Sequence, residues 1–224
     1  MTWIKICGIT NPEDAAASVD AGADALGFVL YERSPRKMSV GQVREITSLL
    51  APSIEFVGVF VDISLDVMIN ISRTAGLKGM QLHRTDLFQP KRESSQPDKE
   101  AFTACCAGDL KLYYALPARG LTWESSGHHP DIRILLDSST KEQPGGTGKP
   151  FDWAEASALV AQMRKDVNVI VAGGLTPQNV GSAIRMLRPW GVDVSSGVEV
   201  APGKKDPEKV RAFIRAVREA DEIA

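Results

Sequence analysis

Eight short apolar runs rich in β-branched residues mark this chain, and each is followed by a turn signal and then by a helical pattern. Within each run the hydrophobicity is continuous rather than alternating, which predicts strands buried on both faces, as in a parallel sheet covered by helices. Their strict alternation with helices predicts an α/β fold, a (β/α)8 TIM barrel. The predicted strands span residues 3–7, 25–30, 55–61, 79–83, 110–116, 132–137, 167–172 and 192–195.

Helix start and stop signals separate these runs, and a single barrel domain over residues 1–224 is expected. The stretch 84–107 is polar enough to predict only a short helix, and 117–131 is typical of a loop where the helix after the fifth strand should stand. An open doubly wound sheet is the alternative, but it often has a Gly-rich turn after its first strand, which "CGITNPED" lacks. The predicted helices span 15–21, 40–50, 65–75, 154–164, 180–187 and 206 to about 220.

Composition narrows the functional classes. With a formal net charge of -2 and scattered basic residues, the chain gives no reason to expect nucleic acid or an anionic membrane as a partner. No signal peptide and no apolar stretch of membrane-spanning length is visible. The three cysteines include the adjacent pair Cys105 and Cys106, and no Cys or His pair has zinc spacing, so we expect a cytoplasmic protein without disulfides or a metal site.

The carboxyl ends of barrel strands hold the active site, because the following loops converge there. The first strand delivers Cys7 to this end and the fourth delivers His83. Three aspartates, Asp62, Asp137 and Asp193, close other strands. Asp137 ends the apolar run "IRILLD", where partial desolvation would raise its pKa and suit a general acid. Position alone does not choose among the three.

Cys7 stands in "KICGIT" and has two interpretations. A free cysteine is most often a small buried hydrophobe. At a strand end, however, Gly8 would leave the thiol uncovered towards a substrate, and Lys5, two residues back on the same face, would favour a thiolate. These residues leave a catalytic and a packing role equally open, whereas redox chemistry lacks a neighbouring resolving cysteine.

Two glycine-containing loops predict a phosphate site. Gly173 and Gly174 follow the seventh strand and lead into a helix, and Ser195, Ser196 and Gly197 follow the eighth. Backbone N–H groups and helix N-termini at these two positions are the usual phosphate site of barrels that bind phosphorylated ligands. The segment "GGTGK" is not a Walker A loop and is better interpreted as a lid over the same site. Arg36 in "RSPRK" could hold a carboxylate or could be a solvated charge.

The ordered set "KICGIT", "GADALGFV", "SPR", "VGVFV", "QLH", "GGTGKPFDW", "AGGLTPQNV" and "GVDVSSGVE" resembles the phosphoribosylanthranilate isomerase family of tryptophan biosynthesis. The resemblance runs from residue 4 to about 215. It implies a TIM barrel and an Amadori rearrangement without a cofactor. The substrate would be N-(5-phosphoribosyl)anthranilate and the product 1-(2-carboxyphenylamino)-1-deoxyribulose 5-phosphate.

The resemblance also implies roles for single residues. Cys7 would be the general base and Asp137 the general acid. Arg36 would bind the anthranilate carboxylate, and His83 would line the pocket. The phosphate site would comprise Gly173, Gly174, Ser195, Ser196 and Gly197. The implied partner is a phosphorylated aminosugar, and the chain would be a monomer or a homodimer.

The chain departs from the usual family pattern at three places, one of which is Lys37-Met38 after "SPR", where an aromatic residue is frequent. Arg84 follows "QLH" where glycine is usual, and Asp62 stands where asparagine is common. A related histidine-pathway isomerase performs the same rearrangement with an aspartate on the first strand, so Cys7 argues against that activity. A noncatalytic phosphate-binding barrel is the other alternative, and loss of Cys7 or Asp137 would be its signature. Both residues are present.

Overall fold

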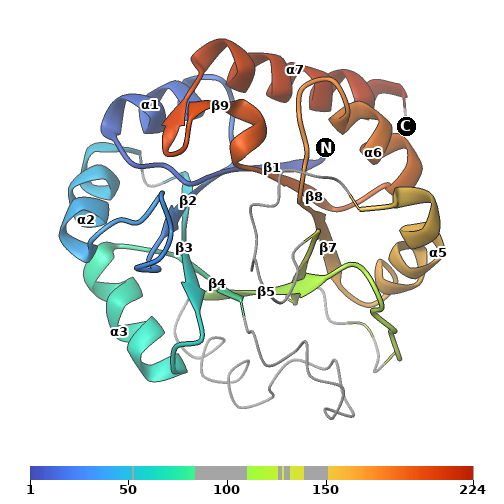
Figure 1. The fold of residues 1–224 in the computed structure, drawn as a ribbon, viewed down its shortest axis with the longest axis horizontal. Helices are drawn as coiled ribbons and strands as arrows, with labels where there is room; N and C mark the ends of the chain where they lie inside the picture. Colours follow the sequence, from blue (N-terminus) through green and yellow to red (C-terminus); the bar gives the residue numbers. More distant parts are fainter. Residues whose placement is uncertain (52, 84–109, 126–127, 129–131, 139–150, 224) are drawn as a thin grey trace.

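Eight parallel strands close into a barrel in sequence order, β1 to β8, surrounded by a ring of helices (Figure 1), which confirms the predicted TIM barrel. The structure is a computed structural model that describes residues 1–51, 53–83, 110–125, 128, 132–138 and 151–223. Every predicted strand is present, with ends within two residues of the expected ones. The strands are β1 Trp3–Cys7, β2 Ala25–Val29, β3 Glu55–Val61, β4 Gly79–His83, β5 Lys111–Pro117, β6 Arg133–Asp137, β7 Asn168–Val171 and β8 Gly191–Val194.

The helices begin where capping residues satisfy their first N–H groups. Asn11 accepts from the Asp14 N–H, Ser39 forms a capping box with Gln42, and Asp152 accepts from two N–H groups of the next turn. Ser64, whose residue type before an apolar helical pattern predicts a side-chain cap, stands at the N-cap position but makes no side-chain cap. The helices are α1 Pro12–Asp20, α2 Val40–Leu49, α3 Leu65–Ala75, α5 Trp153–Met163, α6 Val180–Leu187 and α7 Pro207–Ile223.

The connection between β5 and β6 has no helix in its described residues, 118–125, 128 and 132, as the sequence predicted. The short helix expected within 84–107 lies outside the described residues, because the structure describes nothing from 84 to 109. In the part of the chain that is described, no helix combines the length and the apolar character needed to cross a membrane.

Side chains fill the barrel in two separate apolar regions. The larger region lies between the strands and the helices, and a smaller one fills the barrel interior. Alternate residues of each strand face inward, so Lys5 and Cys7 of β1 share the interior with Asp193 of β8, which lies directly opposite Lys5. The interior members are Ala25, Val57, Tyr113, Ala115, Leu135, Ile170 and Ala172.

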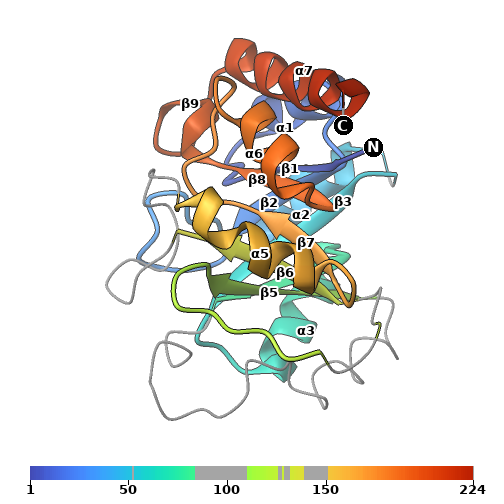
Figure 2. The same ribbon diagram turned by 90° about the vertical axis from the view of Figure 1, so that its right-hand side faces the viewer.

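A short hairpin follows β8 and lies at the carboxyl ends of the strands. It consists of β9 Glu199–Ala201 and β10 Lys204–Lys205, and a 3-10 turn, Ser196–Val198, leads into it. Figure 2 shows β9 and the N-terminus at opposite ends of the barrel. The hairpin therefore lies on the side of the barrel where the loops after the strands converge.

Candidate active site

One cavity of about 430 Å³ opens at the carboxyl ends of the strands, and all nine site residues singled out from the sequence line it. They come from the ends of β1, β4 and β6 and from the loops after β2, β7 and β8. The barrel thus brings together residues that are more than 180 positions apart in the sequence, such as Cys7 and Gly197. The nine are Cys7, Arg36, His83, Asp137, Gly173, Gly174, Ser195, Ser196 and Gly197.

Cys7 is almost fully enclosed at the end of β1. Its sulfur lies against Gly27 on β2, where a Cβ atom would come within 2.7 Å of Sγ. Arg36 and Ser195 occupy the space beside Gly8, so the access of the Cys7 thiol to a substrate is through the cavity that it lines. A Cβ on Gly8 would lie 2.6 Å from Arg36 Cδ and 2.9 Å from Ser195 Oγ, and the φ of Gly8 is +77°.

Burial raises the pKa of the Cys7 thiol above its ordinary value of 9.0, and the Asp193 carboxylate acts in the same direction. The ammonium groups of Lys5 and Lys205 lower it and so offset part of that effect. The expected influence of Lys5 on the thiol is therefore present but does not dominate. Lys5 itself lies fully inside the barrel, with its Nζ 2.9 Å from Asp193 Oδ1.

Asp137 closes β6 and is buried, with only 6% of the residue exposed. Desolvation, followed by the nearby Asp193 carboxylate, raises its pKa from 3.8 to about 6. The loop after β7 can pack against the Asp137 side chain because residue 173 is a glycine. A Cβ on Gly173 would lie 2.5 Å from Asp137 Oδ1 and 2.4 Å from Ser138 Oγ. A carboxyl group in this state can hold a proton near neutral pH and deliver it into the cavity.

The three strand-end aspartates therefore have different environments. Asp193 forms the buried ion pair with Lys5, and Asp137 has the raised pKa. Asp62 is exposed, does not line the cavity and adopts a φ of +47°. Asparagine and aspartate are the non-glycine residues that tolerate this left-handed conformation best, so an aspartate suits this position.

The loops after β7 and β8 pack directly on each other. A Cβ on Gly197 would lie 1.9 Å from the Leu175 carbonyl oxygen, so only glycine fits there. Gly173 and Gly174 both have positive φ, +76° and +68°. Together with Ser195 and Ser196 these glycines make a wall of backbone and hydroxyl groups, which is the chemistry that binds a phosphate.

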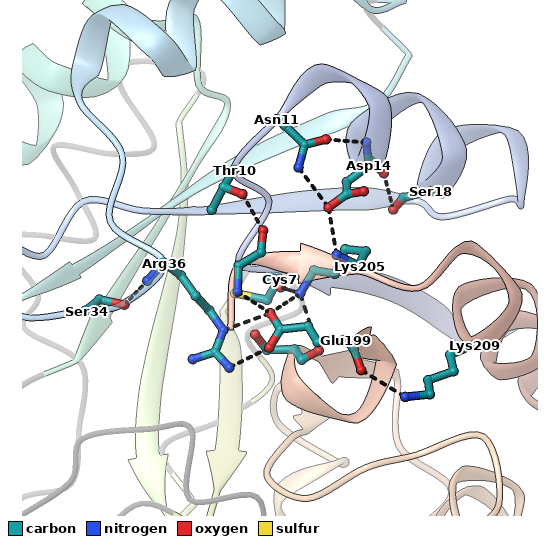
Figure 3. A network of polar contacts seen from close by, with 12 residues as sticks. Cys7, Thr10, Asn11, Asp14, Ser18, Ser34, Arg36, Glu199, Lys205 and Lys209 are labelled. Atoms are coloured by element: carbon teal, nitrogen blue, oxygen red, sulfur yellow. Dashed lines mark hydrogen bonds and ion pairs between the residues drawn. The ribbon is translucent and has the colours of Figure 1, made fainter. Parts of the chain in front are cut away.

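Arg36 does hold a carboxylate, but an internal one. Its Nε and Nη2 atoms donate to Glu199 at 2.8 and 2.6 Å, a bidentate pair (Figure 3). Burial acts to raise the pKa of Glu199, but the hydrogen bonds from Arg36 and the charge of Lys205 bring it below its ordinary value. The Nε–Nη2 edge of Arg36 is thus occupied, and the Nη1 side remains for a ligand.

His83 lines the cavity from the end of β4, as the sequence suggested. Burial and the charge of Lys5 lower its pKa to about 4, so the imidazole is neutral at physiological pH. Gln81 Nε2 lies 2.8 Å from His83 Nε2. Since the amide nitrogen donates, Nε2 accepts and the ring proton is on Nδ1.

Gln81, Glu199 and Lys205 were not predicted from the sequence as parts of this site. Glu199 ends the quoted motif "GVDVSSGVE", and Lys205 follows in "PGKKDPEK". Both segments resemble solvated loop in composition, and only the hairpin geometry brings them under the cavity wall. Among the residues that the structure describes, no cluster of three or more His, Cys, Asp or Glu could hold a metal ion.

Several sequence predictions lie outside the described residues. These concern the rim at Arg84, the adjacent pair Cys105 and Cys106, and the lid predicted within 138–150, of which only Ser138 is described. They stay predictions.

The chain is similar to one family of known proteins over nearly all its length. A family model described as N-(5'phosphoribosyl)anthranilate (PRA) isomerase matches residues 4–216. The N-(5'-phosphoribosyl)anthranilate isomerase of Trichlorobacter lovleyi is 42% identical over 223 residues, which cover 98% of this chain and 100% of the relative.

Solved structures agree with this relationship. Monomers generated from the dimeric phosphoribosylanthranilate isomerase of Thermotoga maritima match with a TM-score of 0.76 at 32% identity, covering 98% of this chain and 100% of theirs. A phosphoribosylanthranilate isomerase in complex with reduced 1-(o-carboxyphenylamino)-1-deoxyribulose 5-phosphate matches with a TM-score of 0.75 at 33% identity and the same coverage. The chain therefore belongs to the N-(5'-phosphoribosyl)anthranilate isomerase family.

Proposed function

We propose that this chain catalyses the Amadori rearrangement of N-(5-phosphoribosyl)anthranilate to 1-(2-carboxyphenylamino)-1-deoxyribulose 5-phosphate, with Asp137 as general acid and Cys7 as general base. The observation that carries the proposal is the shared cavity of these two residues, which also touches the glycine loops after β7 and β8. Family membership supplies the reaction, and the geometry supports the assignment of roles.

The acid would act first. Asp137, with its pKa raised to about 6, would donate a proton to the furanose ring oxygen. The C–O bond of the ring then breaks, the electron pair stays on the protonated oxygen as a hydroxyl group, and the anthranilate nitrogen supplies its lone pair to form a Schiff base. Because Asp137 leaves this step as a carboxylate, the net charge of the enzyme and its ligand together is conserved.

The base would complete the rearrangement. The thiolate of Cys7 would remove the proton from C2 of the sugar, and the electron pair moves into the C1–C2 bond while the C1=N π pair returns to nitrogen, which gives an enolamine. Tautomerisation then places a proton on C1 and removes the proton of the C2 hydroxyl, which leaves a ketone at C2. Proton exchange with solvent returns Asp137 to its acid form and Cys7 to the thiolate. Cys7 and Asp137 stand on β1 and β6, which are not adjacent in the barrel, so they can reach a bound sugar from different sides.

The remaining groups would hold the two anionic ends of the substrate. The N–H groups at Gly173 and Gly174 and the hydroxyls of Ser195 and Ser196 suit the phosphate. The Nη1 side of Arg36 suits the anthranilate carboxylate, because Glu199 fixes the opposite edge of the same guanidinium. The proposed reaction needs neither a nucleic acid nor a membrane as partner. The chain would work as a monomer or as a homodimer, and light scattering after gel filtration distinguishes the two.

The two pKa directions have a consequence for the pH profile. The acid titrates at about 6 and the base above 9.0, so the active form, with a neutral acid and a thiolate, is a minor species. Between these values the thiolate fraction rises with pH as fast as the neutral acid fraction falls. We expect a flat kcat/KM between the two pKa values, with losses below about pH 6 and above the thiol pKa.

The test is a continuous assay that follows the loss of anthranilate-type fluorescence from the purified chain. The variants are Cys7→Ala and Asp137→Ala, with Asp62→Ala as a matched control at a strand end outside the cavity. We expect kcat to fall about 10²–10⁴-fold in the first two variants and to stay near wild type in the control. Normal turnover by either site variant would overturn its assigned role, and no turnover by folded wild type would overturn the function.

A further inference from the structure

Lys205 is a buried lysine that does not line the cavity, yet it contacts three parts of the site wall (Figure 3). Its Nζ donates to the Cys7 carbonyl oxygen at 2.5 Å, to the Ser195 carbonyl oxygen at 3.3 Å and to Glu199 Oε1 at 2.8 Å. These are one acceptor from β1, one from the loop after β8 and one from the residue that holds Arg36. The three acceptors match the three hydrogens of an ammonium group.

The backbone around Lys205 directs its side chain inward. Its own N–H donates to Asp14 Oδ2 of α1 at 2.7 Å, and Asp14 is held in turn by the capping residue Asn11. Thr10 donates to the Gly203 carbonyl oxygen in the turn between β9 and β10. The hairpin is thus docked on the start of α1, and the Lys205 side chain extends from it towards the end of β1, where its Nζ meets the Cys7 carbonyl oxygen.

The cluster brings charged groups close to Cys7. Arg36 and Lys205 are two cations, and Glu199 is the carboxylate that both of them contact. Asp14 adds a second carboxylate at the Lys205 backbone N–H, and Lys5 and Asp193 form a further ion pair. The ammonium group of Lys205, held on the Cys7 carbonyl oxygen, places one positive charge beside the residue whose thiolate it would favour. Low polarity around the site makes this field stronger than it would be in water.

We propose that Lys205 is a positioning residue for the base: it fixes the backbone of Cys7 against the loop after β8 and supplies a positive charge that favours the thiolate. The inference rests on the proposed role of Cys7. Burial lowers the pKa of Lys205 below its ordinary value while Glu199 raises it, and Lys205 in turn lowers the pKa of Cys7. The charged groups that act on Cys7 are Lys5, Arg36, Asp193 and Lys205, the carboxylates Glu199 and Asp14 contact Lys205, and Asp137 and His83 lie across the cavity.

The test measures the thiol directly, so that it does not depend on turnover. The rate at which iodoacetamide alkylates Cys7 is followed from pH 6 to 10 in a chain whose other two cysteines are replaced by serine. In Lys205→Met we expect alkylation at pH 8 to be about tenfold slower than in the parent, with the profile displaced to higher pH. The matched control is Lys204→Met, which removes a charge from the exposed side of the same strand.

Steady-state kinetics separate positioning from folding. Lys205→Met should lower the kcat/KM plateau by a similar factor through kcat and move its alkaline limit upward, whereas a purely structural role would leave that limit in place. A folded Lys205→Met with the parent's alkylation profile overturns the inference. If wild type shows no turnover but Lys205→Met still shifts the profile, the proposed function fails while the effect of Lys205 on the thiol stands.

A second variant, Glu199→Gln, removes a negative charge near Cys7 where Lys205→Met removes a positive one. It remains informative if Lys205→Met does not fold. Glu199→Gln keeps an oxygen acceptor for Lys205 but removes the carboxylate charge, so the positive charges of Arg36 and Lys205 beside Cys7 are less compensated. We expect alkylation at pH 8 to be several-fold faster than in the parent. An unchanged or slower rate in folded Glu199→Gln would overturn the inference.

Discussion

Each end of the barrel holds one buried glutamate that is contacted by two cations. Glu55 stands at the amino ends of the strands, at the start of β3, and Glu199 stands beyond their carboxyl ends, in the hairpin after β8. Both side chains are less than 10% exposed. The two clusters have the same composition of charges but differ in what surrounds them, and this difference separates stability from function.

At the amino end, aromatic rings close over the cluster. Arg133 donates to Glu55 at 3.0 Å and to the Tyr113 hydroxyl, and Tyr113 donates to the same carboxylate. The guanidinium carbon of Arg133 lies 4.8 Å from the Trp190 ring and 5.9 Å from the Trp3 ring. The polar groups of Glu55, Tyr113 and Arg133 face one another or a ring, and Lys111 alone in the cluster reaches into solvent.

At the carboxyl end, the cluster borders a cavity instead. Arg36 lines the cavity and Lys205 supports its wall from behind. Here Lys205 holds the backbone of Cys7, and Glu199 binds one edge of Arg36 and leaves the other edge for a ligand. In TIM barrels, residues at the amino end of the strands contribute to stability and residues at the carboxyl end contribute to function. Glu55 and Glu199 fit this division, because each is a buried glutamate between two cations and only the cluster around Glu199 borders the cavity.

The largest effect is expected at the amino end. Glu55→Gln keeps the volume but leaves Arg133 and the buried Tyr113 hydroxyl without a carboxylate, so we expect the free energy of unfolding to fall by about 3 kcal/mol. The measurement is urea unfolding followed by circular dichroism. Below the unfolding transition, kcat should stay within about twofold of wild type, and a large loss of kcat in the folded variant would contradict the separation of the two ends.

A substitution of Asp137 should have the opposite effects to Glu55→Gln: stability at neutral pH should rise, and turnover should be lost. Its pKa of about 6 lies above the ordinary 3.8, so the native state binds the proton more tightly than the unfolded chain. That contribution to stability is complete below about pH 3.8 and is lost as the pH rises through about 6. At pH 7.5 the ionised carboxylate then costs up to about 3 kcal/mol, a cost that Asp137→Asn would remove.

The measurement compares Asp137→Asn with wild type by urea unfolding at pH 7.5 and pH 4.5. We expect the variant to be more stable at pH 7.5, the difference to shrink at pH 4.5, and turnover to be lost. A variant that is less stable than wild type at pH 7.5 would show that the carboxylate is held by favourable contacts rather than strained by desolvation.

Gly173 offers an intermediate effect with a matched control. Gly173→Ala and Gly120→Ala both place a methyl group on a left-handed backbone, φ +76° and +74°, but only the first meets neighbours within 4 Å. Because the methyl group collides with Asp137, we expect kcat to fall about 10²-fold in Gly173→Ala alone. Equal kinetics in the two variants, with similar stability, would contradict a role for this glycine in placing the acid.

The sequence predicted the barrel and the residues around the cavity well, for a physical reason. Strands buried on both faces have continuous apolar runs, and the polar residue that ends each run must point into the converging loops. Cys7, His83 and Asp137 follow that rule. Strand bounds differed by one residue, for example where the polar residues Lys111 and Arg133 begin a strand.

What the sequence did not predict depends on contacts between distant segments. Arg36 was expected to hold a ligand carboxylate or to be a solvated charge, because nothing in "RSPRK" shows that Glu199 would return 163 residues later to hold it. Gly8 was interpreted as open space for the same reason. The role of Lys205 follows from the docking of the hairpin on α1, which no local pattern encodes.

The smallest effect is expected at Lys111, which divides the amino-end cluster into a buried and a solvated part. Its Nζ lies 2.8 Å from Glu55 Oε2, but its side chain is 49% exposed, whereas that of Arg133 is 12% exposed. We expect Lys111→Ala to lower the free energy of unfolding by about 0.5 kcal/mol, and the loss to shrink in 1 M salt because the exposed charge is screened. Urea unfolding at both salt concentrations measures this. A loss as large as that of Glu55→Gln would mean that Lys111, rather than Arg133 under its aromatic rings, is the cation on which the closed end of the barrel depends.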